Sequence, residues 1–291
     1  MSYRQGVALV VLAALMWSLM GLMIRLVGDA STWHVLFYRS LGMIPVLFAL
    51  ITWRSGGAPF RSIRATGWAG LLGGAGLVVA FAGAIFAIQS TTVANAVFMF
   101  SVAPLMTAVL GAVFLGERVG GRTMIAIGIA LIGIFVMVRE GLAIGAGAGN
   151  LAALLSSAGF AVFTVLLRRQ HVTDHTPAIL IGAILSVAVA ALVISLRGES
   201  FALPFRSAAI AVGMGAIILG VGMSLFALGG KSVPAARTSL LALVEVMMSP
   251  IWVWLFIGET AGPGTLLGGA ILLSAIVFLA FADAATNPKM A

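Results

Sequence analysis

A three-residue signature occurs twice in this chain, as Leu115-Gly116-Glu117 and as Ile257-Gly258-Glu259, with the two glycines 142 positions apart. Each copy ends a long apolar run, and another apolar run follows it. The number of membrane-length segments between the copies is odd, so the second copy must have the opposite orientation to the first. We therefore expect two inverted repeats, an architecture that is typical of secondary transporters.

The composition places the chain in a membrane. Hydrophobic residues make up 62% of the 291 residues and charged residues 8%, whereas soluble domains carry about 25% charged residues. A soluble fold of this size could not bury so much apolar surface, so lipid must be its solvent. The net charge of +8 comes from Lys and Arg residues spread over connectors, which argues against a nucleic-acid partner. Because the chain has no cysteine, disulfides, thiolate catalysis and cysteine-based metal sites are excluded. His171 and His175 are four positions apart, but they fall in a connector before Pro177, so we expect no bound metal, and we expect no cofactor.

Ten apolar segments are long enough to cross a bilayer, which requires about 20 residues. The predicted spans are 6–26, 32–53, 66–88, 93–115, 122–138, 150–167, 177–196, 208–228, 234–257 and 264–282. A glycine-rich connector, 141–149, divides the chain into an N-terminal five-helix repeat, 1–143, and a C-terminal five-helix repeat, 144–291. The predicted fold is an all-α membrane protein with two inverted repeats around a central cavity.

Lys and Arg residues predict the orientation. With the N-terminus inside, ten of the sixteen lie in inner tails and connectors, four lie in outer connectors, and Arg39 and Arg237 fall within spans. The positive-inside rule then places both termini in the cytoplasm, which requires an even number of spans. Glu117 is then inside and Glu259 outside, as inversion demands, and each is expected to organise its connector or to cap the helix that follows.

Short motifs in both halves resemble those of one family. They are Ala14-Leu15-Met16-Trp17-Ser18, Phe37-Tyr38-Arg39, Ala103-Pro104-Leu105, Val165-Leu166-Leu167-Arg168-Arg169, Ser249-Pro250 and the two Gly-Glu signatures. Their order and spacing resemble the drug/metabolite transporter superfamily, in its ten-helix branch with two EamA-type repeats, over almost the whole chain. The resemblance implies a multi-pass carrier of a bacterial-type inner membrane, with a cavity between the halves. Similar members include exporters of neutral and aromatic amino acids.

Residues at mid-membrane depth predict the substrate site. Trp17 lies halfway along the first span, where its indole N–H needs a partner that a cavity can supply; a packed tryptophan bonded to a backbone carbonyl is the alternative. At a shift of 143 positions Trp17 corresponds to Phe160, so the cavity should be aromatic but not chemically symmetric. The predicted lining is Trp17, Phe81, Asn95, Met99, Phe160, Ser224, Leu241 and Glu245.

Glu245 is expected near mid-membrane, where a lone charge costs roughly 2.5 kcal/mol or more. It is therefore a candidate for binding a substrate amine or for proton coupling, and a structural ion pair is the alternative. Arg39 is expected to bond backbone carbonyls in a structural role. Arg237 is expected to reach the inner interface, or to share a cavity with Glu245. Pro104 and Pro250 are expected to interrupt the fourth span of each half, either for gating or as static kinks.

These features predict a secondary transporter that exports small amphipathic solutes, above all neutral or aromatic amino acids, by alternating access. An exporter of drugs, metabolites or lipid-linked substrates is the alternative, because Arg39 and Arg237 suit a headgroup. An intramembrane enzyme is disfavoured, since only three His and eight acidic residues exist and no hydrolase motif is present. A channel is disfavoured because no acidic ring or carbonyl filter is visible. The expected partners are a small-molecule substrate, the lipid bilayer and a coupling proton if Glu245 titrates.

Overall fold

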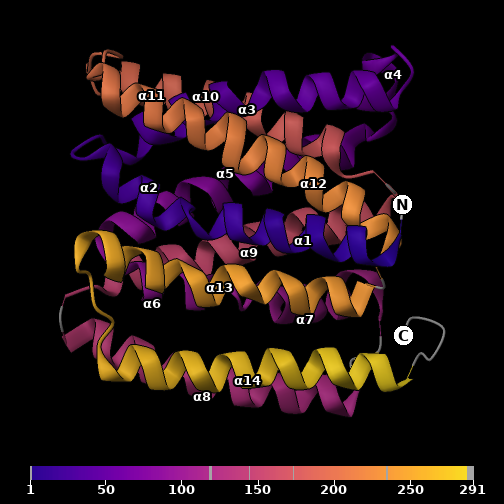
Figure 1. The fold of residues 1–291 in the computed structure, drawn as a ribbon, viewed down its shortest axis with the longest axis vertical. Coiled ribbons are helices and arrows are strands. Elements are labelled where there is room, and N and C mark those ends of the chain that lie inside the picture. Colours follow the sequence, from indigo (N-terminus) through magenta and orange to yellow (C-terminus); the bar gives the residue numbers. More distant parts are fainter. Residues whose placement is uncertain (1, 118–119, 144, 173, 234, 287–291) are drawn as a thin grey trace.

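The computed structural model describes residues 2–117, 120–143, 145–172, 174–233 and 235–286, and all regular structure in these ranges is helical (Figure 1). Eight spans in them are long and apolar enough to cross a membrane. Two shorter apolar stretches, Leu241–Ile257 and Pro263–Leu279, belong to the last two helices and bring the number to ten. The predicted all-helical fold with ten spans is confirmed. The predicted boundary between the repeats falls on Ile144, which lies outside the described residues.

The first repeat supplies spans one to five. Spans two, three and five are the single helices α3 (Thr32–Arg54), α5 (Gly67–Ser90) and α8 (Gly121–Ala143). Spans one and four are each divided near the middle, into α1 (Tyr3–Ser18) with α2 (Met20–Val27) and α6 (Val93–Phe100) with α7 (Ala103–Leu115). A short helix between spans two and three is α4 (Pro59–Ala65).

The second repeat supplies spans six to ten. Four of them are single helices: α9 (Gly147–Arg169), α10 (Thr176–Leu196), α13 (Ala235–Ile257) and α14 (Pro263–Thr286). Span eight consists of α11 (Phe205–Gly213), a π-helix η1 (Met214–Val221), α12 (Gly222–Gly229) and the 3-10 turn η2 (Gly230–Ser232). Because π-helices are rare and concentrate at functional sites, this span is a natural place to look for the substrate.

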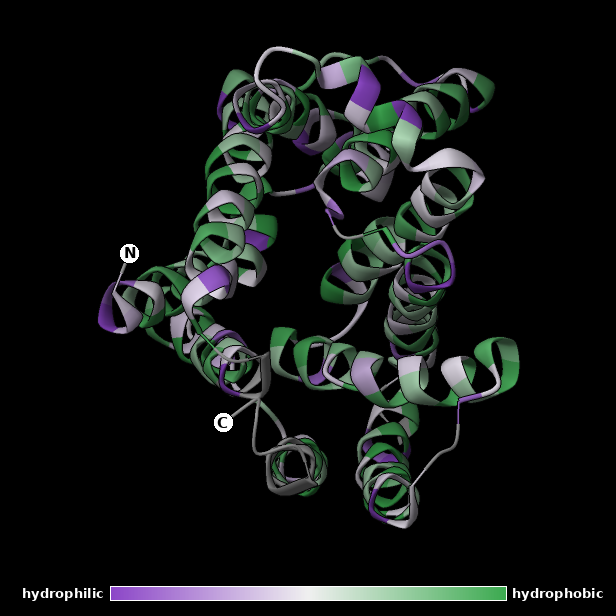
Figure 2. Ribbon diagram, turned by 90° about the vertical axis from the view of Figure 1, so that its right-hand side faces the viewer, coloured by the Kyte–Doolittle hydropathy of each residue, from purple (hydrophilic) through white to green (hydrophobic). Residues whose placement is uncertain are grey.

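The spans lie side by side, so that their ends form two opposite faces of the bundle (Figure 1). We call the face that holds the start of α1 the near end; α4 and the last turn of α14 lie there too. The far end holds the turns that follow α2, α5 and α13. Viewed from the near end, the helices are coloured mostly as apolar, with fewer polar residues among them (Figure 2). This distribution matches a bundle that crosses a bilayer.

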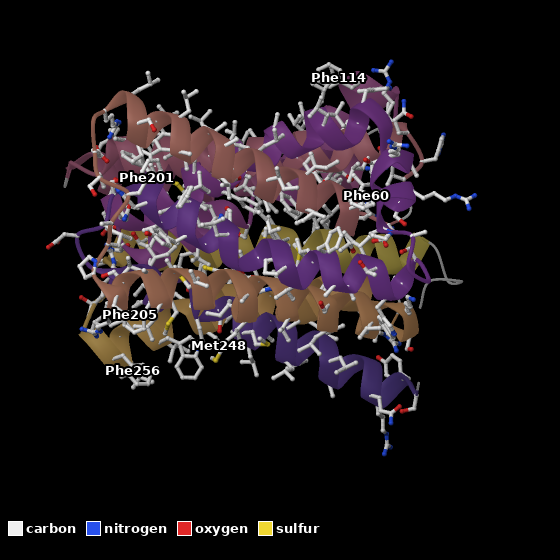
Figure 3. All side chains as sticks on the ribbon, turned by 90° about the horizontal axis from the view of Figure 1, so that it is seen from above. Phe60, Phe114, Phe201, Phe205, Met248 and Phe256 are labelled. Atoms are coloured by element: carbon white, nitrogen blue, oxygen red, sulfur yellow. The ribbon has the colours of Figure 1, made fainter. Side chains whose placement is uncertain are left out.

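Large apolar side chains cover the outside of the bundle. Phe60, Phe114, Phe205 and Phe256 lie on its outer surface (Figure 3) and are between 59% and 89% exposed. A soluble monomer rarely exposes so much contiguous apolar surface, so this surface is the one that faces lipid.

Glycines bring helices of the two repeats into backbone contact. A Cβ atom at Gly159 of α9 would lie 2.5 Å from the carbonyl oxygen of Gly76 in α5. A Cβ atom at Gly215 of η1 would lie 1.7 Å from the carbonyl oxygen of Arg39 in α3. Since any larger residue would force the helices apart, the glycine-rich third and eighth spans are packing surfaces between the repeats.

The first span runs parallel to α13 in a fixed register. Three side-chain contacts join them, each between residues 234 positions apart: Tyr3–Arg237, Ser18–Trp252 and Arg25–Glu259. A constant offset along the whole span means that the two helices advance together from the near end to the far end. Span one of one repeat is thereby held against span nine of the other.

The two prolines of the fourth spans lie in different settings. Span four is interrupted immediately before Pro104, which occupies the first turn of α7. The Ser157 hydroxyl of α9 donates there to the carbonyl oxygens of Met99, at 3.0 Å, and Phe100, at 3.3 Å, and so satisfies acceptors at the break. Pro250 lies inside the continuous helix α13. Of the two expected interruptions, only the one at Pro104 is present.

Candidate substrate cavity

A cavity of about 740 Å³ extends from the near end to Trp17, in the last turn of α1. Its rim includes Arg54, Asp174 and the exposed Lys231. Its wall is made by apolar side chains from both repeats: Trp17, Phe160, Phe163, Ile179, Met223 and Phe226. A concave, mostly apolar site of this size with a few polar groups is typical of a small-molecule site.

Trp17 and Phe160, which occupy corresponding positions in the two repeats, both line this cavity. The ring centroid of Trp17 lies 5.1 Å from that of Phe226. Gly222 makes room for the indole, because a Cβ atom there would lie 2.6 Å from Trp17 Nε1. The indole N–H is buried and has no hydrogen-bond partner in the described ranges. An unpaired donor at a cavity wall is a group that a bound solute can satisfy.

The sequence prediction missed one face of span eight. Met223, Phe226, Ala227 and Gly230 all line the cavity. They follow the i, i+3, i+4, i+7 spacing of a single helix face, which is the sequence signal that could have identified them together. Arg54 also lines the cavity and was not predicted to do so. In the sequence it counts only as one of the Lys and Arg residues that predict membrane orientation.

The rim of the cavity carries more positive than negative charge. Arg54 Nη1 lies 3.7 Å from Asp174 Oδ1, while the Nε and Nη2 atoms of Arg54 are buried and have no partner among the described residues. Lys231 adds a second cation to the same rim. Two cations against one carboxylate favour the approach of an anionic group.

His175 lies at the rim, at the start of α10. Its ring meets that of Phe163 edge-on, with centroids 5.9 Å apart. Burial lowers the pKa of His175, because it disfavours the charged imidazolium, and the neighbouring Asp174 carboxylate and a hydrogen bond with the backbone of Val172 oppose this effect. His175 therefore adds less positive charge to the rim at neutral pH than an exposed histidine would.

Phe81 supports a buried arginine. The Arg39 guanidinium carbon lies 4.6 Å from the centroid of the Phe81 ring. Arg39 is 3% exposed, and its Nε and Nη2 atoms are buried with no hydrogen-bond partner in the described part of the chain. The expected bonds from Arg39 to backbone carbonyls are absent from that part, because the aromatic face occupies the position in front of the guanidinium.

Asn95 and Met99 lie in the core between α6 and α9. The Asn95 side-chain amide donates to the Thr91 hydroxyl, at 3.0 Å, and to the Asn150 side-chain oxygen. Met99 has no exposed surface. Neither residue lines the near-end cavity. A buried amide needs hydrogen-bond partners, and Asn150 of α9 is such a partner for Asn95.

The near-end cavity is not lined by Ser224, Leu241 or Arg237 either. The Ser224 hydroxyl donates to the carbonyl oxygen of Gly220 in its own helix, at 2.8 Å. Leu241 is a half-buried residue of α13. Arg237 is exposed at the near end, where its Nη1 atom donates to the Tyr3 hydroxyl at 3.0 Å. Arg237 thus reaches the near-end interface, as a long cationic side chain does by extending its head toward water.

Glu245 is half-buried on α13 and makes no hydrogen bond or ion pair within the described ranges. It shares a helix face with Ser249 and Trp252, at i+4 and i+7, and Trp252 contacts the first span. Met247, on the opposite face, is 60% exposed. The carboxylate is thus on the side of α13 that faces protein, and none of the described arginines pairs with it as a structural ion pair would require.

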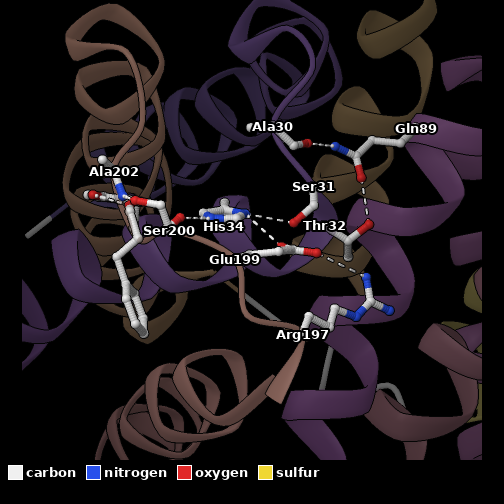
Figure 4. Close-up of polar contacts among 11 residues, drawn as sticks. Ala30, Ser31, Thr32, His34, Gln89, Arg197, Glu199, Ser200 and Ala202 are labelled. Atoms are coloured by element: carbon white, nitrogen blue, oxygen red, sulfur yellow. Dashed lines mark hydrogen bonds and ion pairs between the residues drawn. The ribbon is translucent and has the colours of Figure 1, made fainter. Parts of the chain in front are cut away.

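Polar contacts within the first repeat and between the repeats hold the far end together (Figure 4). His34 of α3 makes a 2.8 Å hydrogen bond between its Nε2 and the carbonyl oxygen of Ser200, in the turn before α11. His34 Nδ1 lies 3.7 Å from Glu199 Oε2. Gln89 of α5 accepts a 2.6 Å hydrogen bond from Thr32. These bonds tie spans two, three, seven and eight together at the end opposite the cavity rim.

Glu259 caps a helix of the other repeat. Its carboxylate accepts hydrogen bonds from the Val93 backbone N–H, at 2.6 Å, and from Arg25 Nε, at 2.8 Å. Glu259 was expected to organise its connector or to cap the helix that follows; of these, the cap of α14 is formed by Glu140, which bonds the first turn of that helix. A carboxylate is favoured at the N-terminus of α6 by the unpaired backbone N–H groups there.

The sequence matches the EamA-like transporter family twice, over residues 4–139 and 147–281. An uncharacterized transporter of Archaeoglobus fulgidus is 29% identical over 280 residues, which cover 94% of this chain and 96% of the relative. The pseudopaline exporter of Pseudomonas aeruginosa is 25% identical over 289 residues, which cover 95% of this chain and 96% of the relative. A crystal structure with 18% identity shares the fold, with a TM-score of 0.67 over 95% of this chain and 97% of that chain. This chain belongs to the EamA-like transporter family of the drug/metabolite transporter superfamily, and it is a membrane transporter and not an enzyme.

Proposed function

We propose that this transporter exports small amphipathic solutes, with neutral and aromatic amino acids as the first class, across a bacterial-type inner membrane by alternating access. The observation that carries the proposal is the near-end cavity, whose wall contains Trp17, Phe160 and Phe226 and whose rim is charged. Aromatic rings bind apolar side chains through buried area, and the charged rim suits the polar end of the same solute. A relative named as an exporter of pseudopaline supports outward transport of a small molecule.

The proposal places the near end in the cytoplasm, with both termini. The excess of Lys and Arg in near-end connectors supports this orientation. A solute would then enter the cavity from the cytoplasm, and the contacts at the far end would have to break before release. Glu245 is the candidate for a coupling proton, because its carboxylate faces protein and has no ion-pair partner in the described ranges.

The test is uptake by proteoliposomes that contain the purified protein. The panel is radiolabelled phenylalanine, leucine, alanine, aspartate and lysine, and protein-free liposomes are the control. We expect counterflow of phenylalanine and leucine above the control, and weak movement of lysine, which the cationic rim repels. Absence of counterflow for every amino acid, from a preparation with a cooperative thermal transition, would overturn the amino-acid assignment.

An amphipathic lipid-like substrate is the second candidate, and one observation favours it. A far-end hollow of about 890 Å³ is lined by Arg25 and Arg197 and by Val79, Phe86 and Leu155. The three apolar side chains are between 41% and 50% exposed, so an apolar chain in the hollow could contact them. Its basic and apolar groups together suit a headgroup and a chain. Movement of a fluorescent phospholipid between leaflets of the same proteoliposomes, assayed by dithionite quenching, would favour this candidate over amino acids.

A further inference from the structure

Arg39 is the most deeply buried arginine side chain that lacks an acidic partner in the described part of the chain. It lies seven residues into α3, about 10 Å from the far-end start of that helix at ~1.5 Å per residue. Its 3% exposure leaves almost no contact with water, and two of its three nitrogens are buried without a hydrogen bond to any described residue. Burial of a guanidinium in this state is costly, because these N–H donors have no acceptor and no acidic residue in the described ranges balances the charge.

Four other arginines of the bundle each have at least one polar partner. Arg25 is paired with Glu259, Arg54 lies near Asp174, and Arg168 is paired with Glu117. Arg237 donates to a tyrosine hydroxyl. The difference is not explained by packing alone, since an apolar residue of similar volume would fill the same space without the cost of a buried charge.

The position of Phe81 connects Arg39 to the substrate cavity. Phe81 packs against the buried cluster around Leu77 and Phe163, and Met223 packs against the same cluster. Phe81 also packs against the second buried cluster of the bundle, as Trp17 does. Met223 and Trp17 both line the cavity. Neither Arg39 nor Phe81 lines the cavity itself; Phe81, with Arg39 over its ring, is linked to the cavity wall through these shared buried clusters.

We propose that Arg39, held over Phe81, is a subsite for the carboxylate group of the transported solute; this inference rests on the proposed function. A guanidinium presents parallel N–H donors that match the two oxygens of a carboxylate, and the two unpartnered nitrogens, Nε and Nη2, are such a pair. The aromatic ring holds the guanidinium by a cation–π contact and leaves its edge free. Arg54 and Lys231 at the rim would draw the same anionic group inward.

The proposed subsite fixes the orientation of an amino acid bound in the cavity. A carboxylate at Arg39 directs the apolar part of an amino acid toward the ring of Trp17 and its neighbour Phe226. It also explains why a lipid-exposed bundle keeps a buried, unpaired cation, because the ligand supplies the missing partner. The π-helix η1 supports this arrangement: Gly215 packs against the Arg39 backbone so closely that it fixes where the side chain begins.

The experiment compares pairs of compounds that differ only in the carboxylate. The pairs are phenylalanine with phenylalaninol, and phenylacetate with 2-phenylethanol. Binding to the purified protein is measured by intrinsic tryptophan fluorescence and by thermal shift. The variants are Arg39→Gln, Arg39→Lys and Phe81→Leu, with Arg237→Gln as a control that removes an exposed guanidinium.

We expect wild-type protein to bind each carboxylate more tightly than its alcohol. Arg39→Gln should weaken carboxylate binding roughly 10- to 100-fold, as loss of a charge-assisted hydrogen bond does, and should leave alcohol binding unchanged. Arg39→Lys should recover only part of the loss, because an ammonium lacks the fork. Phe81→Leu should weaken carboxylate binding less than Arg39→Gln, and Arg237→Gln should have no effect.

Thermal stability separates this role from a structural one. Without ligand, Arg39→Gln should melt at the same temperature as wild type or higher, since it removes an unpaired buried charge. If Arg39→Gln does not fold, Arg39→Lys is measured in its place. The proposed subsite would then be overturned if Arg39→Lys bound phenylacetate as tightly as the wild type does. Equal loss of the carboxylate and of its alcohol would also overturn it, as would failure of wild type to prefer either carboxylate.

The outcomes distinguish this inference from the proposed function. If phenylacetate binding depends on Arg39 but no amino acid binds or moves, the subsite stands and the amino-acid assignment fails. If amino acids are transported and Arg39→Gln moves them with unchanged affinity, the proposed function stands and the subsite fails.

Discussion

Arg25 and Glu259 form an ion pair across the two repeats, with 2.8 Å between Nε and Oε2. At the other end of the bundle, Arg168 and Glu117 form a second pair between the repeats. In the inverted repeat, Arg25 corresponds to Arg168 at a shift of 143 positions and Glu117 to Glu259 at a shift of 142. Each repeat therefore contributes the arginine of one pair and the glutamate of the other.

The two pairs differ in what else they hold. At the far end, Arg25 also donates to the Thr91 carbonyl oxygen, at 2.7 Å, and Glu259 also caps α6. At the near end, Arg168 has Glu117 as its only hydrogen-bonded side-chain partner within the described ranges. The far-end pair therefore joins three segments, whereas the near-end pair joins two. This asymmetry fits a cavity that is accessible from the near end.

Loss of the Glu259 carboxylate should loosen closure at the far end. Met223→Cys places the chain's sole thiol on the cavity wall, because the native chain has no cysteine. In the protein with Met223→Cys alone, we expect an impermeant maleimide to label this thiol from the near side. Glu259→Gln should add labelling from the far side, about fivefold or more for a loss of ~1 kcal/mol in closure. The matched Glu117→Gln variant should not add it, and equal far-side labelling in both variants would contradict the assignment.

Trp17→Ala should weaken binding of large solutes more than that of small ones. The change removes the ring that contacts Phe226 across the cavity wall. Loss of about 2 kcal/mol of apolar contact corresponds to roughly 30-fold in Kd for phenylalanine, with little change for alanine. Trp254→Ala is the control, because Trp254 is 57% exposed on the lipid-facing surface. Equal effects of Trp17→Ala on both amino acids, measured in proteoliposomes, would remove Trp17 from the substrate site.

Glu245→Gln should separate a functional carboxylate from a structural one. A neutral amide costs less to bury than a carboxylate, so folding should survive. Transport should fall sharply, or should lose its pH dependence if protons are coupled. Melting temperature and flux are measured on the same preparation. Reduced stability together with normal flux per folded molecule would show that Glu245 only stabilises the fold.

The pH dependence of stability should include a contribution from His175. Its pKa in the folded state lies below the ordinary value of 6.5, chiefly because of burial. The unfolded state therefore binds a proton more readily, so the free energy of unfolding should fall as the pH drops below about 6.5. His175→Asn should reduce this acid-side loss. Melting curves at pH 7.5 and pH 5.5 test it: an equal loss on acidification in the variant and the parent would contradict the assignment.

Reporter fusions test the orientation. A reporter joined after Ser90 should lie outside, and one joined after Gly120 should lie inside, because the connectors with most Lys and Arg are expected in the cytoplasm. Ser90 is the last residue of α5 and Gly120 directly precedes α8, so a fusion after either residue leaves the preceding helix intact. Opposite results at the two sites would invert the map and place the cavity mouth outside.

Some features of the site were readable from the sequence, and others required distant partners. The repeat predicted that Trp17 and Phe160 correspond, and both line the cavity. The expected depth of Asn95 in the membrane also predicted that it lines the cavity, but depth in the membrane does not determine the direction in which a side chain points. Asn95 is turned toward Asn150, because a buried amide pairs with another amide when one is within reach.

The sequence by itself determined that the chain crosses a membrane ten times in two related halves. This follows from local physics: each span needs about 20 apolar residues, and connectors concentrate charge. Only the tertiary structure decided the pairing of Arg25 with Glu259, 234 positions away, and the absence of a partner for Arg39 in the described ranges. Both depend on helix register and on the close approach that glycines allow, and these are properties of packing between helices that no single segment encodes.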